Sequence, residues 1–176
     1  MRLLGVQLFL CLILMPTSLW AFCFTQASEK YNVPENLLRA IAAHESSMNP
    51  KAISKKNSDG TYDIGLMQIN SWWMPQLYKY GISQKSLLNN PCLNLHVGAW
   101  ILATNFHTHG KSWNSVGAYN AGFKPSREPL RKTYVGYIKN QLKKLQEGTE
   151  PPISTPRLNE QLANAKSYGF GSVVFE

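Results

Sequence analysis

The sequence has 176 residues, which is enough for one domain of ordinary size and a short extension. Hydrophobic residues make up 44% of it and charged residues 16%, a balance that excludes a disordered chain and a polytopic membrane protein. The formal net charge of +8 favours a polyanionic neighbour such as nucleic acid, anionic lipid or a cell-wall polymer, and charge alone does not choose among them.

The N-terminus predicts an export signal. Arg2 is followed by an apolar run from Leu3 to Met15, then by Pro16 and by small or polar residues that end at Ala21. A membrane-spanning helix needs about 20 apolar residues, and this run is shorter. We therefore expect cleavage after Ala21, a periplasmic location and no stable membrane span in the mature chain. A retained membrane anchor is the alternative.

The cysteines predict a disulfide. Cleavage removes Cys11 and leaves Cys23 and Cys92, an even number in an exported chain. Because the compartment outside the inner membrane is oxidising, these two are expected to pair. Two buried free thiols are the alternative.

Helical periodicity dominates the rest of the chain, and strict alternation is rare, so a mainly α domain is expected. Helices are predicted over about 34–47, 93–109 and 129–147. Pro34 suits the first turn of the first helix, and Gly110 and Gly148 suit the ends of the other two. Turn-forming residues fill 54–65 and predict at most a short hairpin, or an irregular loop, around Asp59 and Gly60.

A change in composition marks the end of the domain. From Thr149 onward Pro151, Pro152 and Pro156 interrupt any helix. The chain is therefore expected to divide into a signal peptide at 1–21, one domain at 22–148, and a Pro-containing linker and flexible tail at 149–176.

One carboxylate lies on an apolar helix face. Leu38, Ile41, Ala42 and Glu45 follow the spacing i, i+3, i+4, i+7, so the stripe that should be buried ends in an acid. Burial raises the pKa of a carboxyl, and a raised pKa suits a general acid that works near neutral pH. Exposure of Glu45 at the helix end, or pairing with a Lys or Arg, is equally compatible with the periodicity.

Asp59 and Asp63 are the plausible partner acids for Glu45. The other acids of the domain lie beside helix starts or in the polar surroundings of the last helix. Asp59 is expected to form a turn with Gly60. Asp63 runs directly into the segment GLMQIN.

Four motifs then occur in order: AIAAHESS at 40–47, GLMQIN at 65–70, GAYNAG at 117–122 and YV at 134–135. Together they resemble the motifs of the soluble lytic transglycosylases, and more closely the small single-domain members encoded beside conjugation, pilus and specialised secretion systems. The resemblance spans about residues 23–142. It implies a lysozyme-like, mostly α fold.

The resemblance also implies an activity. It is cleavage, without water, of the β-1,4 bond between N-acetylmuramic acid and N-acetylglucosamine in peptidoglycan. Glu45 occupies the position of the family's single catalytic acid. It would protonate the glycosidic oxygen and then accept the proton of the muramoyl C6 hydroxyl, which closes a 1,6-anhydro ring. The expected role is local opening of the wall for a secretion, pilus or conjugation apparatus, whose components are expected partners.

Further site residues are carried over from the motifs. The side chains expected to line the cleft or to lie near Glu45 are Ser46, Asp63, Met67, Gln68, Tyr119, Asn120 and Tyr134.

Two alternatives stay open. The segment 59–73 also resembles the part of animal-type lysozymes that carries their second carboxylate, here Asp63. A hydrolase that uses Glu45 and Asp63 is therefore an alternative. The other is a glycan-binding assembly factor that has lost cleavage, against which the acid on an apolar stripe argues.

The remaining signals point to no cofactor, metal or nucleic acid. The four histidines lack companion acids or cysteines at metal-ligand spacing. The basic pairs are short and scattered; they are Lys55–Lys56, Arg131–Lys132 and Lys143–Lys144. One of Trp72 and Trp73 is expected at the cleft rim, whereas Trp100 and Trp113 are expected in the core.

Overall fold

The computed structural model describes residues 18–148, with side chains from residue 23 onward. The predicted tail and all but the last few residues of the predicted signal peptide lie outside the described residues. Within them, no helix combines the length and the apolar character that crossing a membrane requires.

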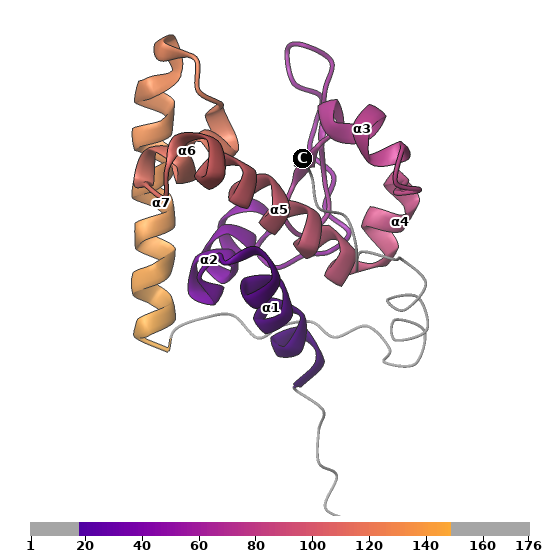
Figure 1. Cartoon of the computed structure of the whole chain (residues 1–176), viewed down its shortest axis with the longest axis horizontal. Helices are drawn as coiled ribbons and strands as arrows, with labels where there is room; N and C mark the ends of the chain where they lie inside the picture. The colour runs from indigo at the N-terminus through magenta and orange to yellow at the C-terminus, as the bar shows by residue number, and fades with distance from the viewer. Residues whose placement is uncertain (1–17, 149–176) are drawn as a thin grey trace, which may run out of the picture.

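The domain is mainly α-helical, as predicted, with one small antiparallel sheet. Helices and strands follow in the order α1 (Ser18–Tyr31), α2 (Glu35–Ser46), β1 (Asp63–Ile64), β2 (Ile69–Asn70), η1 (Ser71–Trp73), α3 (Met74–Tyr78), α4 (Gln84–Asn89), α5 (Pro91–His109), α6 (Trp113–Ala121), η2 (Pro125–Arg127) and α7 (Glu128–Gln146). The three predicted helices correspond to α2, α5 and α7. Figure 1 shows α7 at one side of the molecule, α3 and α4 at the other, and α5 between them.

Helix α5 forms the centre of the core. Its side chains are apolar around most of its circumference, and it packs against α1, α4 and α6. A helix that is apolar on all sides is expected to be buried. Its start is fixed by Asn90, whose side chain accepts a hydrogen bond from Leu93 N at 3.0 Å.

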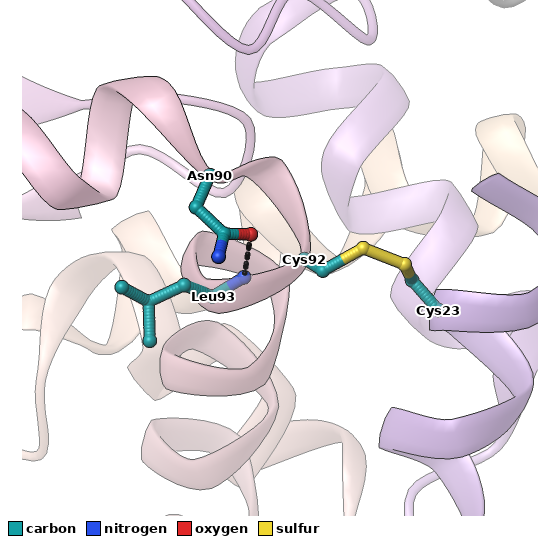
Figure 2. Close-up of a disulfide and its surroundings, with 4 residues drawn as sticks. All are labelled: Cys23, Asn90, Cys92 and Leu93. Atoms are coloured by element: carbon teal, nitrogen blue, oxygen red, sulfur yellow. Dashed lines mark hydrogen bonds between the residues drawn. A yellow bond between two sulfur atoms is a disulfide. The ribbon is translucent and has the colours of Figure 1, made fainter. Parts of the chain in front are cut away.

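A disulfide joins α1 to the first turn of α5. Cys23 pairs with Cys92, with 5.6 Å between their Cα atoms (Figure 2). The pairing expected for an exported chain is therefore present. Phe24 and Ala27, in the two turns that follow Cys23, are fully buried, so the disulfide fastens a helix that also contributes to the core.

The turn-rich segment forms the predicted short hairpin and continues into a second one. Ile53 pairs with Ile64 across a turn in which Asp59 Oδ1 accepts a hydrogen bond from Thr61 N at 3.0 Å. Strand β1 then pairs antiparallel with β2, which sets Asp63 opposite Asn70. Residues 65–68 make the turn between these two strands.

The structure corrects one aromatic assignment. Trp100 is buried in the core as expected, but the expectation for Trp113 is wrong, because 43% of its surface is exposed. Trp113 is the first residue of α6, at the surface, where the ammonium of Lys139 lies 4.9 Å from its ring centre.

Candidate active site

Glu45 lies in the last turn of α2 and faces α7. The apolar stripe before it, Leu38, Ile41 and Ala42, is fully buried. The buried Tyr134 of α7 donates its hydroxyl to Glu45 Oε1 at 2.5 Å. Two residues 89 positions apart are therefore in contact. The periodicity left open whether Glu45 is buried, exposed or paired with a cation, and in the structure its carboxylate is directed inward.

The environment of Glu45 raises its pKa to about 7. Burial is the largest cause, and the negative charge of Asp63 adds to it, whereas the hydrogen bond from Tyr134 acts in the opposite direction by favouring the carboxylate. A carboxyl with a pKa near 7 holds and releases a proton with comparable ease at neutral pH, which is what an acid that must then act as a base requires.

Two tyrosines lie at the site, Tyr134 buried and Tyr119 partly buried. Burial raises the pKa of Tyr119 and of Tyr134 well above the usual value, and the charge of Glu45 raises both further. Both phenols therefore stay protonated at any physiological pH and serve as hydrogen-bond donors.

Asp63 projects from β1 and is held by neighbours on both sides. Asn70 Nδ2 donates to its Oδ1 at 2.8 Å, and Ser54 Oγ donates to its Oδ2 at 3.1 Å. Both carboxylate oxygens therefore accept hydrogen bonds from the hairpin. Asp63 acts on Glu45 through its charge.

The turn at 65–68 is fixed from three helices. Tyr119 of α6 donates to Met67 O at 2.8 Å, and Ser46 of α2 donates to Leu66 O at 2.7 Å. The buried Asn94 of α5 accepts a bond from Met67 N at 2.8 Å and donates to Ile64 O at 2.9 Å. These bonds tie the turn to α2, which carries Glu45, and to α5 and α6.

Two glycines permit this close approach. Gly65 has φ +76°, and a Cβ there would overlap the side chain of Asn94. A Cβ on Gly98 would lie 2.8 Å from Met67 Cβ. The Met67 side chain is thus packed in the core beneath the turn, against α5.

The other expected cleft residues lie at different depths. Gln68 has a left-handed backbone with φ +47°, and its Nε2 donates to Gly65 O at 2.8 Å. Asn120, next to Tyr119 at the end of α6, is exposed. Whether these side chains contact a glycan stays a prediction.

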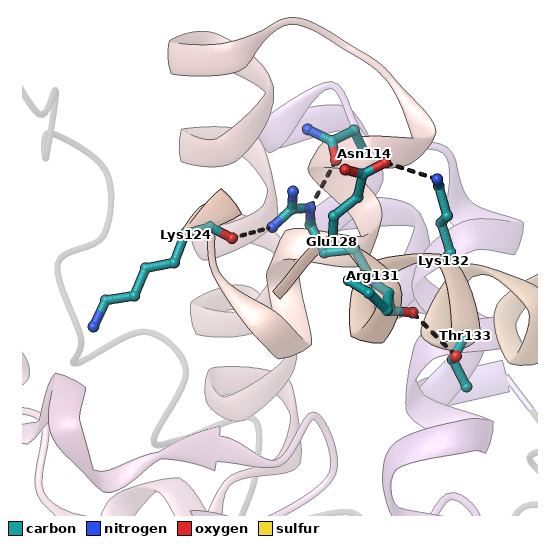
Figure 3. A network of polar contacts seen from close by, with 7 residues as sticks. Asn114, Lys124, Glu128, Arg131, Lys132 and Thr133 are labelled. Atoms are coloured by element: carbon teal, nitrogen blue, oxygen red, sulfur yellow. Dashed lines mark hydrogen bonds and ion pairs between the residues drawn. The ribbon is translucent and has the colours of Figure 1, made fainter. Parts of the chain in front are cut away.

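Asn94 and Arg131 support the site and were not singled out from the sequence. Arg131 Nε donates to Asn114 Oδ1 at 2.7 Å, and its Nη1 donates to Lys124 O at 3.0 Å (Figure 3). The same Nη1 also donates to Gly122 O at 3.0 Å. Its side chain is buried, so it does not form the basic surface pair with Lys132 that the sequence suggested. It fixes the loop after α6 to α7, one turn before Tyr134.

Replacing Arg131 should destabilise the domain. In Arg131→Met, two main-chain carbonyls and one amide oxygen lose a charged donor whose own side chain is buried, and we expect the free energy of unfolding to fall by about 2 kcal/mol. Urea denaturation measures the difference. The matched control is Lys132→Met, which breaks only an exposed pair with Glu128 and should change stability little. Equal losses in both variants would contradict the assigned role.

His44 packs against aromatic side chains of α7. No group of three or more His, Cys, Asp or Glu side chains suited to a metal ion occurs within the part of the chain that the structure describes. His44 instead stacks on Tyr137 with 5.0 Å between ring centres and meets the edge of Tyr134 at 5.3 Å. It thus packs against the tyrosine that binds Glu45.

Comparison with known proteins identifies the family. Residues 22–142 match the profile of the Transglycosylase SLT domain. The chain belongs to this family. Invasion protein IagB of Salmonella typhi is 47% identical over 83% of this chain and 88% of its own length. Protein IpgF of Shigella flexneri is 39% identical over 72% of this chain and 82% of its own length.

A solved structure confirms the fold. An inactive mutant of the lytic transglycosylase Slt from Pseudomonas aeruginosa superimposes with a TM-score of 0.56 at 19% identity. The match covers 78% of this chain and 26% of the Slt chain. The lysozyme-like, mainly α architecture expected for the SLT family is therefore confirmed.

Proposed function

We propose that this SLT domain is a peptidoglycan lytic transglycosylase in which Glu45 is the single catalytic acid and base. The observation that carries the proposal is the inward-facing carboxyl of Glu45, with its pKa near 7 and its hydrogen bond from Tyr134. Membership of the family supports the substrate class. The predicted division at residues 21 and 148, with export to the periplasm, is part of the proposal.

The reaction needs one proton carrier. Protonated Glu45 gives its proton to the β-1,4 glycosidic oxygen as the bond from that oxygen to the muramoyl C1 breaks. The resulting carboxylate takes the proton of the C6 hydroxyl as O6 bonds to C1, so the sugar leaves as a 1,6-anhydro ring and Glu45 is protonated again. Because the nucleophile is part of the substrate, its effective concentration is high and no second protein nucleophile is needed.

Tyr134 suits both halves of this cycle. Its hydroxyl occupies one oxygen of Glu45, which leaves the other to carry the transferred proton. When Glu45 becomes a carboxylate, the same hydrogen bond stabilises the charge. The tyrosine therefore directs the proton and limits how high burial raises the pKa of Glu45.

Asp63 is proposed to tune Glu45 and not to attack the sugar. Both of its oxygens accept hydrogen bonds from Ser54 and Asn70, so it is held within its own hairpin. Removing its charge should lower the pKa of Glu45, because that charge is one of the causes of the raised value.

Asp63→Asn tests this assignment. We expect a loss in kcat of about tenfold and a shift of the alkaline limb of the pH–rate profile to lower pH. Turnover of purified sacculi from pH 5 to 9 measures both. The lysozyme-type alternative, in which Asp63 is nucleophile or stabiliser, requires a loss of about a thousandfold or more with no such shift.

The cellular role proposed is local opening of the wall for a secretion, pilus or conjugation apparatus. The name of one relative, invasion protein IagB, supports this role. Components of such an apparatus are the proposed partners. A chromosomal Glu45→Gln allele should then impair assembly of the apparatus while the protein is still exported.

A further inference from the structure

An open depression of about 420 Å³ lies on α3, outside the Glu45 site. It is lined by Trp72, Pro75, Gln76, Lys79 and Tyr80. These positions follow the spacing of one helix face, so the depression runs along η1 and α3 with an aromatic ring at each end. The site described above uses none of these side chains.

The ring of Trp72 is oriented by packing against other tryptophans. Its ring meets Trp73 edge to face with 5.0 Å between ring centres, and Trp73 meets the buried Trp100 in the same way at 5.3 Å. Trp72 is nevertheless 68% exposed and Tyr80 is 42% exposed. An exposed aromatic ring that is already oriented loses little conformational freedom when a ligand covers it.

One side chain joins this depression to the proposed active site. Asn70 Nδ2 donates to Asp63 Oδ1 at 2.8 Å, while its Oδ1 accepts from Trp72 N at 2.9 Å. The depression therefore begins where the hairpin that carries Asp63 ends.

The lining selects a class of ligand. Tryptophan and tyrosine rings pack against the flat apolar faces of sugars, and the amide of Gln76 can exchange hydrogen bonds with hydroxyl or amide groups. No acid lines the depression, and among the side chains of residues 23–148 no carboxylate forms an ion pair with Lys79. Its ammonium is thus available to a carboxylate of the ligand.

We propose that the α3 depression binds the glycan strand beyond the cleaved bond, with sugar rings on Trp72 and Tyr80 and a carboxylate of a peptide stem on Lys79. This inference rests on the proposed function for its substrate class. It adds a second contact area, so the enzyme would prefer long strands that carry stems over short or stem-free ones.

Binding in a Glu45→Gln background, which prevents cleavage, tests this inference. Titration calorimetry gives the Kd values. It uses the exported protein with its C-terminal segment, and peptidoglycan octasaccharides with or without peptide stems. We expect Trp72→Ala and Tyr80→Ala to weaken binding of both ligands about tenfold, or about 1.4 kcal/mol. Lys79→Met should weaken binding of the stem-bearing ligand about tenfold and of the stem-free ligand less than twofold.

Tyr78→Ala is the matched control. Tyr78 lies on the same helix and is 58% exposed, but it does not line the depression, so its removal should leave both Kd values unchanged. Thermal unfolding verifies that each variant is folded. Trp72 and Tyr80 variants that bind within twofold of their parent would overturn the inference.

Other occupants are distinguishable. If the Trp72 and Tyr80 variants keep their glycan affinity but change their oligomeric state, a second copy of the chain is the occupant. If they keep their glycan affinity but residues 149–176 detach from the domain, the C-terminal segment is the occupant. Either result overturns the inference. Failure of the proposed function is read separately, from the products of the protein with Glu45 intact.

Discussion

Glu45→Gln is expected to lose about a thousandfold or more in kcat on purified sacculi while still binding them. Glutamine keeps the size of the side chain and can accept the hydrogen bond from Tyr134 through its amide oxygen, so the site stays assembled. It cannot give a proton to the glycosidic oxygen or take one from the C6 hydroxyl. Release of soluble muropeptides measures turnover, and co-sedimentation with sacculi measures binding.

The control is Glu35→Gln on the same helix. Glu35 pairs with Arg39 at 2.7 Å in the first turn of α2, at the opposite end of the helix from Glu45, so turnover should be unchanged. Binding without turnover in both the parent protein and Glu45→Gln would instead support the glycan-binding assembly factor.

The same substitution should change how stability depends on pH. The folded pKa of Glu45 is about 7 against 4.5 for the ordinary value, so between these values the folded protein binds more protons than the unfolded chain. The free energy of unfolding therefore falls as pH rises through this window, by about 3 kcal/mol from this one group. Glu45→Gln removes the effect and should be more stable than the parent protein at pH 8 but not at pH 4.

Denaturation across pH 4 to 8 measures that difference. A parent and a variant whose stabilities run parallel over the whole range would contradict the raised pKa. They would also remove the physical basis for Glu45 as an acid near neutral pH.

The second large effect is expected from the disulfide. The double variant Cys23→Ala, Cys92→Ala should lose about 4 kcal/mol of unfolding free energy. The bond closes a loop of 69 residues, which restricts the unfolded chain, and it fastens α1 to the first turn of the central helix α5. Its removal should loosen α1, which is then held by the packing of its buried Phe24 and Ala27 and by the hydrogen bond from Thr25 to Glu35.

Urea denaturation of the variant, beside the parent protein with and without reductant, checks this prediction. The reduced parent should unfold at nearly the same urea concentration as the variant, because both lack the bond. A variant as stable as the oxidised parent would show that α1 needs no covalent link.

Local signals made the long helices predictable. In α2 and α7 the apolar period and a proline at the start agree on the same segments, and in α5 an initial proline, a long apolar run and a terminal glycine do so. Glu45 was found for the same reason, because a charge on an apolar stripe conflicts with its surroundings and such conflicts mark functional positions. The role of Tyr134 came only from the resemblance to the family.

Long-range contacts made the rest unpredictable. Asn94 is separated from its partner Met67 by 27 positions, and no local pattern shows that one buried amide will hold the turn beside Glu45. Its single signal is a polar residue among the apolar positions of α5. Arg131 looked like half of a surface pair, since its acceptors include main-chain carbonyls that the sequence does not display.

Short elements were missed for a different reason. Helix α3 has five residues, too few for a period to be recognised, and its aromatic face is recognisable only once Trp73 and Trp100 support Trp72. The same limit applies to Trp113, whose exposure follows from its place on the first turn of α6.

The central claim is that the substrate's own hydroxyl, and not water, attacks the sugar. Mass spectrometry of muropeptides released from purified sacculi by the exported protein, with Glu45→Gln alongside, tests it most directly. We expect products one water lighter than hydrolysis would give, with 1,6-anhydromuramoyl ends, from the parent protein and none from the variant. Reducing ends from the parent protein would contradict the claim and make Glu45 and Asp63 a lysozyme-like pair.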